Sequence, residues 1–189
     1  MKVGLFFGSF NPMHIGHKVI ASYLAEFTDI EKVMLVVSPQ NPFKAKKTLL
    51  HQHHRLMIIK SEIENNNKLL VSDIEFSMPQ PSYTIDTLVR LKEKNPNDEY
   101  VIIIGSDNLK NLHKWKNYSQ IISDFKIYVY PRNGFDNYTE DENIYIIKDV
   151  PQMEVSASFI RNSIKLGKDV SYLVPDNAWK YIDEMNFYR

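Results

Sequence analysis

Residues 3–17 of the chain, VGLFFGSFNPMHIGH, decide the fold. The first five form an apolar run of strand length, which is typical of a strand buried on both faces of a parallel sheet. A polar loop with Gly8 and Pro12 follows, and from Gly16 onward apolar residues recur at helical spacing. A strand that leads through a short loop into a helix is the first half of a βαβ unit.

The same alternation continues along the chain. Further strand-length apolar runs stand at 33–37, 69–74, 100–104, 127–130 and 144–147. Helical patterns lie between these runs at 16–27, 51–65 and 84–94. Two more helices, with no strand between them, are predicted at 156–166 and 175–185. The pattern predicts an α/β fold: a single domain over 1–189, with a doubly wound, Rossmann-like parallel sheet and a helical C-terminal end.

The composition excludes several classes of protein. The 23 basic and 23 acidic residues balance, which argues against bulk binding of nucleic acid. The absence of cysteine excludes disulfide scaffolds, iron–sulfur clusters and thiol nucleophiles. No apolar run is long enough for a membrane span and no signal peptide is recognisable, so we expect a cytoplasmic protein without a membrane partner. The eleven tyrosines specify no oligomeric state, and a homo-oligomer stays open.

The loop after the first strand has the composition of an anion site. Doubly wound sheets bind ligands outside the carboxyl ends of their strands. Gly8 lets the backbone approach a ligand, and the N–H groups around Ser9 can donate to anionic oxygens. His14 and His17 flank Gly16 at the expected helix start, where free N–H groups and the helix dipole favour phosphate. The loop matches neither G-x-G-x-x-G nor the P-loop, which disfavours most dehydrogenases and P-loop kinases.

Other interpretations of the two histidines exist. A single histidine near a helix start most often caps the helix or lies on the surface. A metal site would need further ligands, and no carboxylate stands nearby in the sequence. Two histidines around a glycine, directly after a buried strand, favour the phosphate interpretation.

Residues 8–17, GSFNPMHIGH, resemble the HxGH signature of the nucleotidylyltransferase superfamily. The closest form is that of the bacterial nicotinate mononucleotide adenylyltransferases. The second signature of that family, I-S-S-T-x-[IL]-R, is similar to residues 155–161, VSASFIR. Ala157 and Ser158 stand where the family has serine and threonine, and Phe7 stands where it often has glycine. The resemblance therefore implies that the Phe7 side chain points away from the ligand.

The second signature has a physical reading of its own. Ser156 or Ser158 can cap a helix that carries Arg161. The free N–H groups of the first turn and a bidentate guanidinium would then form a second anion site, suited to the outgoing pyrophosphate. An ordinary capped helix with an exposed arginine is the alternative interpretation.

Residues 81–88, PSYTIDTL, resemble the S-Y-T-x-D-T-L stretch on the acceptor side of the family. This resemblance implies that the turn around Thr84 receives the nicotinate carboxylate, chiefly through backbone groups. Trp115 is similarly placed to a tryptophan that stacks on the pyridine ring. Asp86 and Trp115 also have structural interpretations, as a turn-stabilising residue and a partly buried core residue.

Further candidates follow other strands. Gly105 and Asp107 match the G-x-D pattern of the family, which implies a contact with the nucleotide ribose. Lys44 lies in an extended loop after the second strand, where the family has a matching lysine that can steer a phosphate. Arg132 follows the fifth strand and is either a phosphate ligand or part of a plain turn.

The resemblance implies transfer of an adenylyl group from ATP to nicotinate mononucleotide, with Mg²⁺ arriving on the ATP and no metal site made by the protein. The catalytic candidates are His14, His17, Lys44 and Arg161. The ATP-binding candidates are Gly8, Ser9, Phe10, His14, His17, Gly105, Asp107, Ser156, Ser158 and Arg161. The acceptor-binding candidates are Lys44, Ser82, Tyr83, Thr84, Asp86, Trp115 and Arg132.

Three alternatives stay open at this point. Two are enzymes with a different acceptor, either nicotinamide mononucleotide or phosphopantetheine. The third is a non-catalytic nucleotide-binding sensor on the same fold. Release of pyrophosphate distinguishes the enzymes from the sensor.

Overall fold

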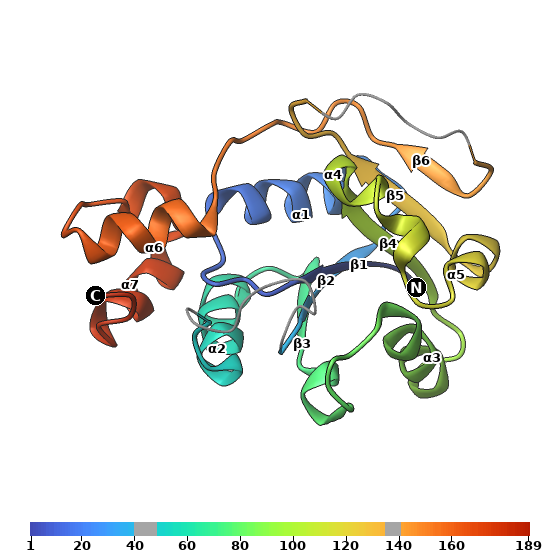
Figure 1. Ribbon diagram of the computed structural model, residues 1–189, viewed down its shortest axis with the longest axis horizontal. Coiled ribbons are helices and arrows are strands. Elements are labelled where there is room, and N and C mark those ends of the chain that lie inside the picture. The colour runs from blue at the N-terminus through green and yellow to red at the C-terminus, as the bar shows by residue number, and fades with distance from the viewer. Residues whose placement is uncertain (40–48, 135–140) are drawn as a thin grey trace.

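The computed structural model describes residues 1–39, 49–134 and 141–189, and Figure 1 shows its arrangement. One parallel sheet of six strands has the order β3-β2-β1-β4-β5-β6. All six strands were predicted, each within two residues at either end. Their bounds are Lys2–Gly8 (β1), Lys32–Val37 (β2), Leu69–Ser72 (β3), Glu99–Gly105 (β4), Lys126–Tyr130 (β5) and Ile144–Ile146 (β6).

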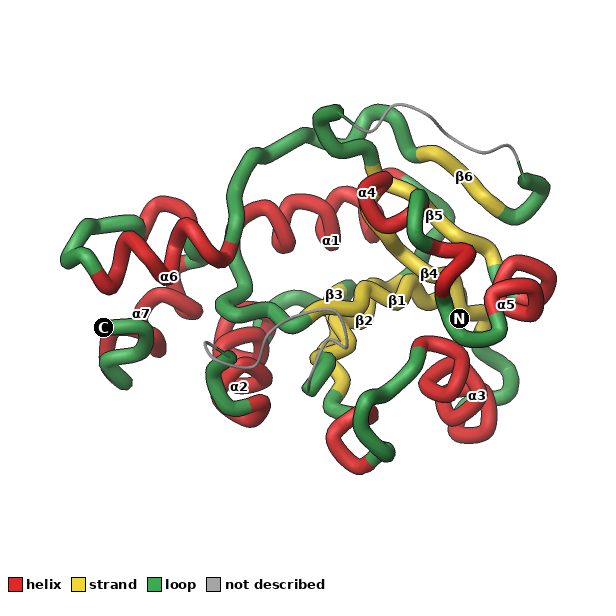
Figure 2. The backbone as a smooth tube through the Cα atoms, viewed as in Figure 1, coloured by secondary structure: helices red, strands yellow, loops and turns green. Residues whose placement is uncertain are grey.

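Seven α-helices surround the strands in the described part of the chain, and Figure 2 shows how they alternate with them. The five predicted helices are all present: Ile15–Phe27 (α1), Gln52–Ile63 (α2), Thr84–Lys94 (α3), Ala157–Lys165 (α6) and Asp176–Glu184 (α7). Two shorter helices were not predicted, Ser106–Leu109 (α4) and Tyr118–Asp124 (α5). They span two turns or fewer, so a helical period is barely visible in their sequences.

Apolar layers cover both faces of the sheet, which explains the continuous apolar strands. Phe6 and Ile103 pack into a core with α1, α2, α6 and α7. Their neighbours Leu5 and Ile102 pack into the opposite core with α3 and α5. Because successive side chains of a strand point to opposite faces, both faces need apolar residues.

The strand order reverses at β1, which lies between β2 and β4. The loop from β1 into α1 and the loop from β4 into α4 therefore flank the crevice where doubly wound sheets bind ligands. The C-terminal helices close one side of this region, since α7 packs against α2 and Figure 1 shows α6 and α7 at the same end of the molecule. The predicted fold class is confirmed.

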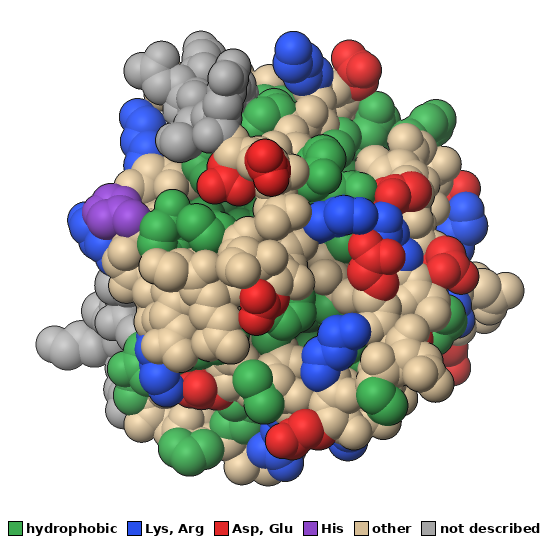
Figure 3. Space-filling model, turned by 90° about the vertical axis from the view of Figure 1, so that its right-hand side faces the viewer, with side chains coloured by type: hydrophobic (Ala, Val, Ile, Leu, Met, Phe, Trp, Pro, Cys, Tyr) green, Lys and Arg blue, Asp and Glu red, His purple; other side chains and the backbone are tan. Residues whose placement is uncertain are grey.

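The described surface carries mixed charge. Figure 3 shows one face, on which acidic and basic side chains are interspersed. Within residues 1–39, 49–134 and 141–189, no helix combines the length and the apolar character that a membrane crossing requires.

Candidate active site

The loop after β1 folds over the ring of its own Phe10. Phe10 is 2% exposed and has a φ of 44°, in the left-handed region that is uncommon for a residue with a side chain. A Cβ on Gly8 would lie 2.8 Å from Cζ of that ring. Gly8 is therefore required by the packing of Phe10 beneath the loop. The ring of Phe10 is therefore inaccessible to a ligand, and only its backbone can contact one.

The imidazole rings of His14 and His17, both predicted site residues, are stacked on each other. Their ring centroids are 3.7 Å apart and the ring planes differ by 28°. The backbone N–H of His14 donates to Nδ1 of His17 at 3.2 Å. A neutral His17 that accepts at Nδ1 carries its proton on Nε2, so it can donate there. The rings of Phe6 and Phe10 contact His17 edge-on, with centroids 5.9 and 5.0 Å away, and restrict its orientation.

His14 is the N-cap residue of α1 and is 6% exposed. Burial and the nearby positive charge of Arg132 lower the pKa of His14 to about 4, so the imidazole is neutral at pH 7. The ring fits because residue 16 is glycine: a Cβ on Gly16 would lie 3.2 Å from Nδ1 of His14.

Gly105, Asp107 and Arg132 form a tight group at the ends of β4 and β5. Nε of Arg132 is 3.4 Å from Oδ1 of Asp107, and its Nη2 donates to the Tyr130 hydroxyl at 3.1 Å. A Cβ on Gly105 would lie only 2.4 Å from the Asp107 carboxylate. Arg132, predicted on the acceptor side, thus pairs with Asp107, which was predicted to bind the nucleotide.

Two buried side-chain polar atoms of the described residues make no hydrogen bond: Nδ1 of His14, and Oδ1 of Asp107, which is ion-paired with Arg132. Buried polar atoms in folded proteins are nearly always paired with protein groups or water. Both atoms belong to residues predicted to bind the nucleotide. Nδ1 of His14, on a loop beside the strand-order reversal, is therefore available to hydrogen-bond a ligand.

The second signature lies directly against the first. Ser156 is the N-cap of α6, since its hydroxyl accepts from the backbone N–H of Phe159 at 3.1 Å. Arg161, one turn further on, donates from Nη1 to the carbonyl oxygen of Asn11 at 2.6 Å and from Nη2 to the Ser158 hydroxyl at 3.2 Å. The structure thus brings together the two signatures, which are far apart in the sequence.

On the acceptor side, a buried carboxylate shapes the predicted turn. Glu75 is 3% exposed and accepts from the hydroxyls of Ser82 at 2.7 Å and Thr87 at 2.9 Å. The Ser82 hydroxyl is therefore engaged with Glu75. Tyr83 precedes the first residue of α3, Thr84. The backbone N–H of Asp86 donates to the Tyr83 carbonyl oxygen, so the N–H groups at the very start of α3 remain as donors.

Lys116 connects the remaining acceptor candidates. Its Nζ contacts both carboxylate oxygens of Asp86, at 2.9 and 3.0 Å, and lies 4.9 Å from the centre of the Tyr83 ring. Trp115 is adjacent and partly buried against the core on the α3 side. Asp86 thus forms an ion pair with a residue outside its own turn. Lys44 lies outside the described residues.

No role was predicted for Arg55, whose side chain is fully buried. Its guanidinium donates to the carbonyl oxygens of Leu50, Ser9, Ser38 and Pro39. These bonds connect α2 to the ends of β1 and β2. Burial lowers the pKa of Arg55 to about 10. One signal was present in the sequence: Arg55 stands three and four residues before Ile58 and Ile59, on the apolar face of the helix.

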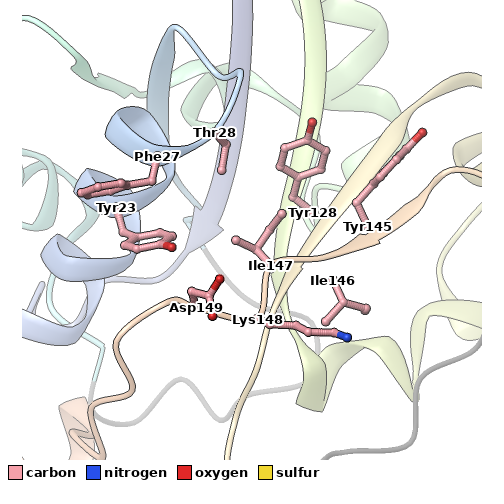
Figure 4. Close-up of a pocket in the computed structure, with 9 residues that line it drawn as sticks. All are labelled: Tyr23, Phe27, Thr28, Tyr128, Tyr145, Ile146, Ile147, Lys148 and Asp149. Carbon is pink, nitrogen blue, oxygen red and sulfur yellow. The ribbon is translucent and has the colours of Figure 1, made fainter.

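A pocket of about 430 Å³ lies away from all these residues. Figure 4 shows its lining, in which Tyr23 and Phe27 of α1 face Tyr128 of β5 and Tyr145 of β6. No predicted site residue contributes to it.

Comparison with known proteins places this geometry in a family. The cytidylyltransferase-like family model matches residues 5–163. The chain belongs to the cytidylyltransferase-like family. A relative from Flavobacterium johnsoniae, named probable nicotinate-nucleotide adenylyltransferase, is 48% identical over the full length of both chains. A relative of the same name from Bacteroides fragilis is 43% identical over 96% of this chain and 90% of its own.

Solved structures agree with the fold. Plasmodium falciparum nicotinic acid mononucleotide adenylyltransferase complexed with NaAD superimposes with a TM-score of 0.81 at 21% identity. The match covers 99% of this chain and 97% of that one. At 21% sequence identity, this similarity supports the fold of the chain and not the identity of its substrates.

Proposed function

We propose that the chain transfers the adenylyl group of ATP to nicotinate mononucleotide in NAD biosynthesis, giving nicotinate adenine dinucleotide and pyrophosphate. The observation that carries the proposal is the contact between Arg161 of the second signature and Asn11 of the first. This contact supports the proposal because it joins the loop that leads into α1 to the helix α6, so that the starts of both helices could bind phosphates of one ligand. Relatives named for this reaction match the chain over its whole length.

The chemistry needs little beyond positioning and charge stabilisation. An oxygen of the acceptor phosphate, already anionic at neutral pH, bonds to the α-phosphorus of ATP. The bond from that phosphorus to the bridging oxygen of pyrophosphate breaks, and pyrophosphate leaves with the electron pair. His17 would donate to the α-phosphate as its negative charge grows, while Arg161 and the start of α6 would hold the departing phosphates. Lys44 would neutralise phosphate charge.

Mg²⁺ would enter with ATP. The described part of the chain has no group of three or more histidines and carboxylates that could hold a metal ion. We expect the ion to be held by the phosphates and water, as is usual for Mg²⁺ on nucleotides. The proposed enzyme is a single domain spanning 1–189, which acts on small molecules in the cytoplasm.

The acceptor follows from the start of α3. The first backbone N–H groups of α3 carry the partial positive charge of a helix N-terminus. This charge favours a carboxylate over the neutral amide of nicotinamide mononucleotide.

The test is pyrophosphate release from ATP and Mg²⁺ with three acceptors in parallel. We expect release to be fastest with nicotinate mononucleotide. Faster release with nicotinamide mononucleotide or phosphopantetheine would overturn the acceptor assignment and keep the transferase. No release with any acceptor, from protein that still binds ATP, would favour a sensor.

The His17→Ala variant should release pyrophosphate more slowly than the unaltered protein. His53→Ala is its control, because His53 is an exposed histidine outside the candidate site.

A further inference from the structure

The side chain of Asn11 is fixed by a residue from the far end of the chain. Asn11 is 5% exposed and precedes Pro12 in the loop of the first signature. Its Oδ1 accepts from the Tyr188 hydroxyl at 2.9 Å and from the backbone N–H of Leu50 at 3.1 Å. The Tyr188–Asn11 hydrogen bond therefore joins residues 177 positions apart.

The backbone of Asn11 makes the other half of the connection. Its carbonyl oxygen accepts from Nη1 of Arg161. A residue that is held through its side chain can turn its carbonyl less freely. The direction of the Arg161 guanidinium therefore depends on the same residue that Tyr188 holds.

Segment 186–189 is folded so that Tyr188 reaches the loop. Asn186 and Tyr188 have φ values of 54° and 67°, a left-handed conformation that residues with side chains adopt only when their surroundings enforce it. Phe187 packs with its ring centre 4.8 Å from that of His54. Arg189 donates to the side chains of Asn186 and Asp183, which ties the segment to α7.

We propose that Tyr188 is a positioning residue for adenylyl transfer: its hydroxyl holds Asn11, and Asn11 orients Arg161 toward the nucleotide phosphates. The proposal rests on the proposed function for the identity of the nucleotide. Burial also raises the pKa of the Tyr188 hydroxyl, so it stays protonated and continues to donate. A phenylalanine at this position would keep the ring and lose the donor.

The experiment compares Tyr188→Phe with Tyr172→Phe in the whole protein. Tyr172 is 71% exposed and serves as the matched control. We expect Tyr188→Phe to weaken ATP binding, measured by calorimetry, about five-fold, which is the size of effect of one hydrogen bond. The KM for ATP should rise in parallel, with the KM for nicotinate mononucleotide unchanged. Tyr172→Phe should leave both constants as they are.

A double-mutant cycle tests whether the effect passes through Arg161. In an Arg161→Lys background, Tyr188→Phe should weaken ATP binding less than two-fold, because the guanidinium it orients is gone. Equal losses in both backgrounds, or a change in thermal stability with no change in ATP affinity, would show a merely structural role. ATP binding without transfer to nicotinate mononucleotide would overturn the proposed function alone, since the binding comparison still applies. No ATP binding by the unaltered protein would overturn both.

Discussion

His14 and His17 share one stack but differ in what they can do for a phosphate. His17 is half-buried and has a proton on Nε2, so it can donate to charge that grows during the reaction. His14 is buried and neutral, with an unpaired Nδ1. The HxGH pattern predicted both residues. It could not predict that burial and Arg132, 118 positions away, would lower the pKa of His14.

The first prediction concerns His17. His17→Ala should lower kcat about 100-fold, the effect of removing one donor from a developing oxyanion. The KM for ATP should change far less, because the contact strengthens only as charge builds. Steady-state kinetics measures both constants, with His53→Ala as the control. A near-normal kcat in the His17 variant would remove His17 from the transition state.

The second prediction concerns His14 and pH. Its pKa in the folded protein is about 4, against about 6.5 when unfolded, so the unfolded chain binds more protons between these values. The stabilisation of the folded state that comes from His14 being neutral is thus fully present above pH 6.5, and it is lost as the pH falls toward 4. Because of His14, we expect the free energy of unfolding to fall by about 2 kcal/mol when the pH is lowered from 7 to 5. Urea unfolding should show that loss in the unaltered protein and a smaller one in His14→Gln. Equal losses would contradict a buried neutral His14.

At the scale of elements, α2 holds the ends of β1 and β2 through Arg55. The helix itself was predicted from its apolar spacing. The role of Arg55 was not, because a sequence pattern does not show that four backbone carbonyls converge on one buried guanidinium. The short helix α4 was missed for a different reason: Gly105 and Asp107 were recognised from a motif, and four residues are too few to show a period.

The third prediction follows from this arrangement. Arg55→Met should destabilise the protein by about 3–5 kcal/mol, because buried carbonyls lose their donors. Arg55→Lys should restore only part of the loss, since one ammonium cannot replace a planar fork. Arg90→Met on α3 is the control. The Arg90 side chain makes no ion pair or hydrogen bond with the described residues. Thermal unfolding of the three variants measures the effect. A loss no larger for Arg55→Met than for the control would contradict the role of Arg55.

At the scale of the whole molecule, the candidate residues fall into two parts on opposite faces of the sheet. The two signatures lie on the side of α1 and α6, and the predicted acceptor turn opens α3 on the other side. The alternation of apolar strands and helices predicted the sheet, and the strand order then placed both parts at one edge. The return of segment 186–189 to the first loop was not predicted, because no local pattern carries a contact over that separation.

The fourth prediction uses this division. Glu75→Gln should disturb Ser82 and Thr87 and raise the KM for nicotinate mononucleotide about ten-fold, the equivalent of about 1.4 kcal/mol, with little change for ATP. Arg161→Lys should show the reverse pattern. Kinetics with each substrate varied in turn gives the four constants. If each variant raised the KM for ATP and the KM for nicotinate mononucleotide equally, the two substrates would not bind to separate parts of the site.

The most direct test of the account identifies the products. The protein is mixed with ATP, Mg²⁺ and nicotinate mononucleotide, and the mixture is analysed by chromatography and mass spectrometry, alongside His17→Ala. We expect nicotinate adenine dinucleotide and pyrophosphate in equal amounts, and far less of both from the variant. Formation of AMP or ADP without the dinucleotide, or equal amounts of dinucleotide from the variant, would contradict adenylyl transfer at the site of the two signatures.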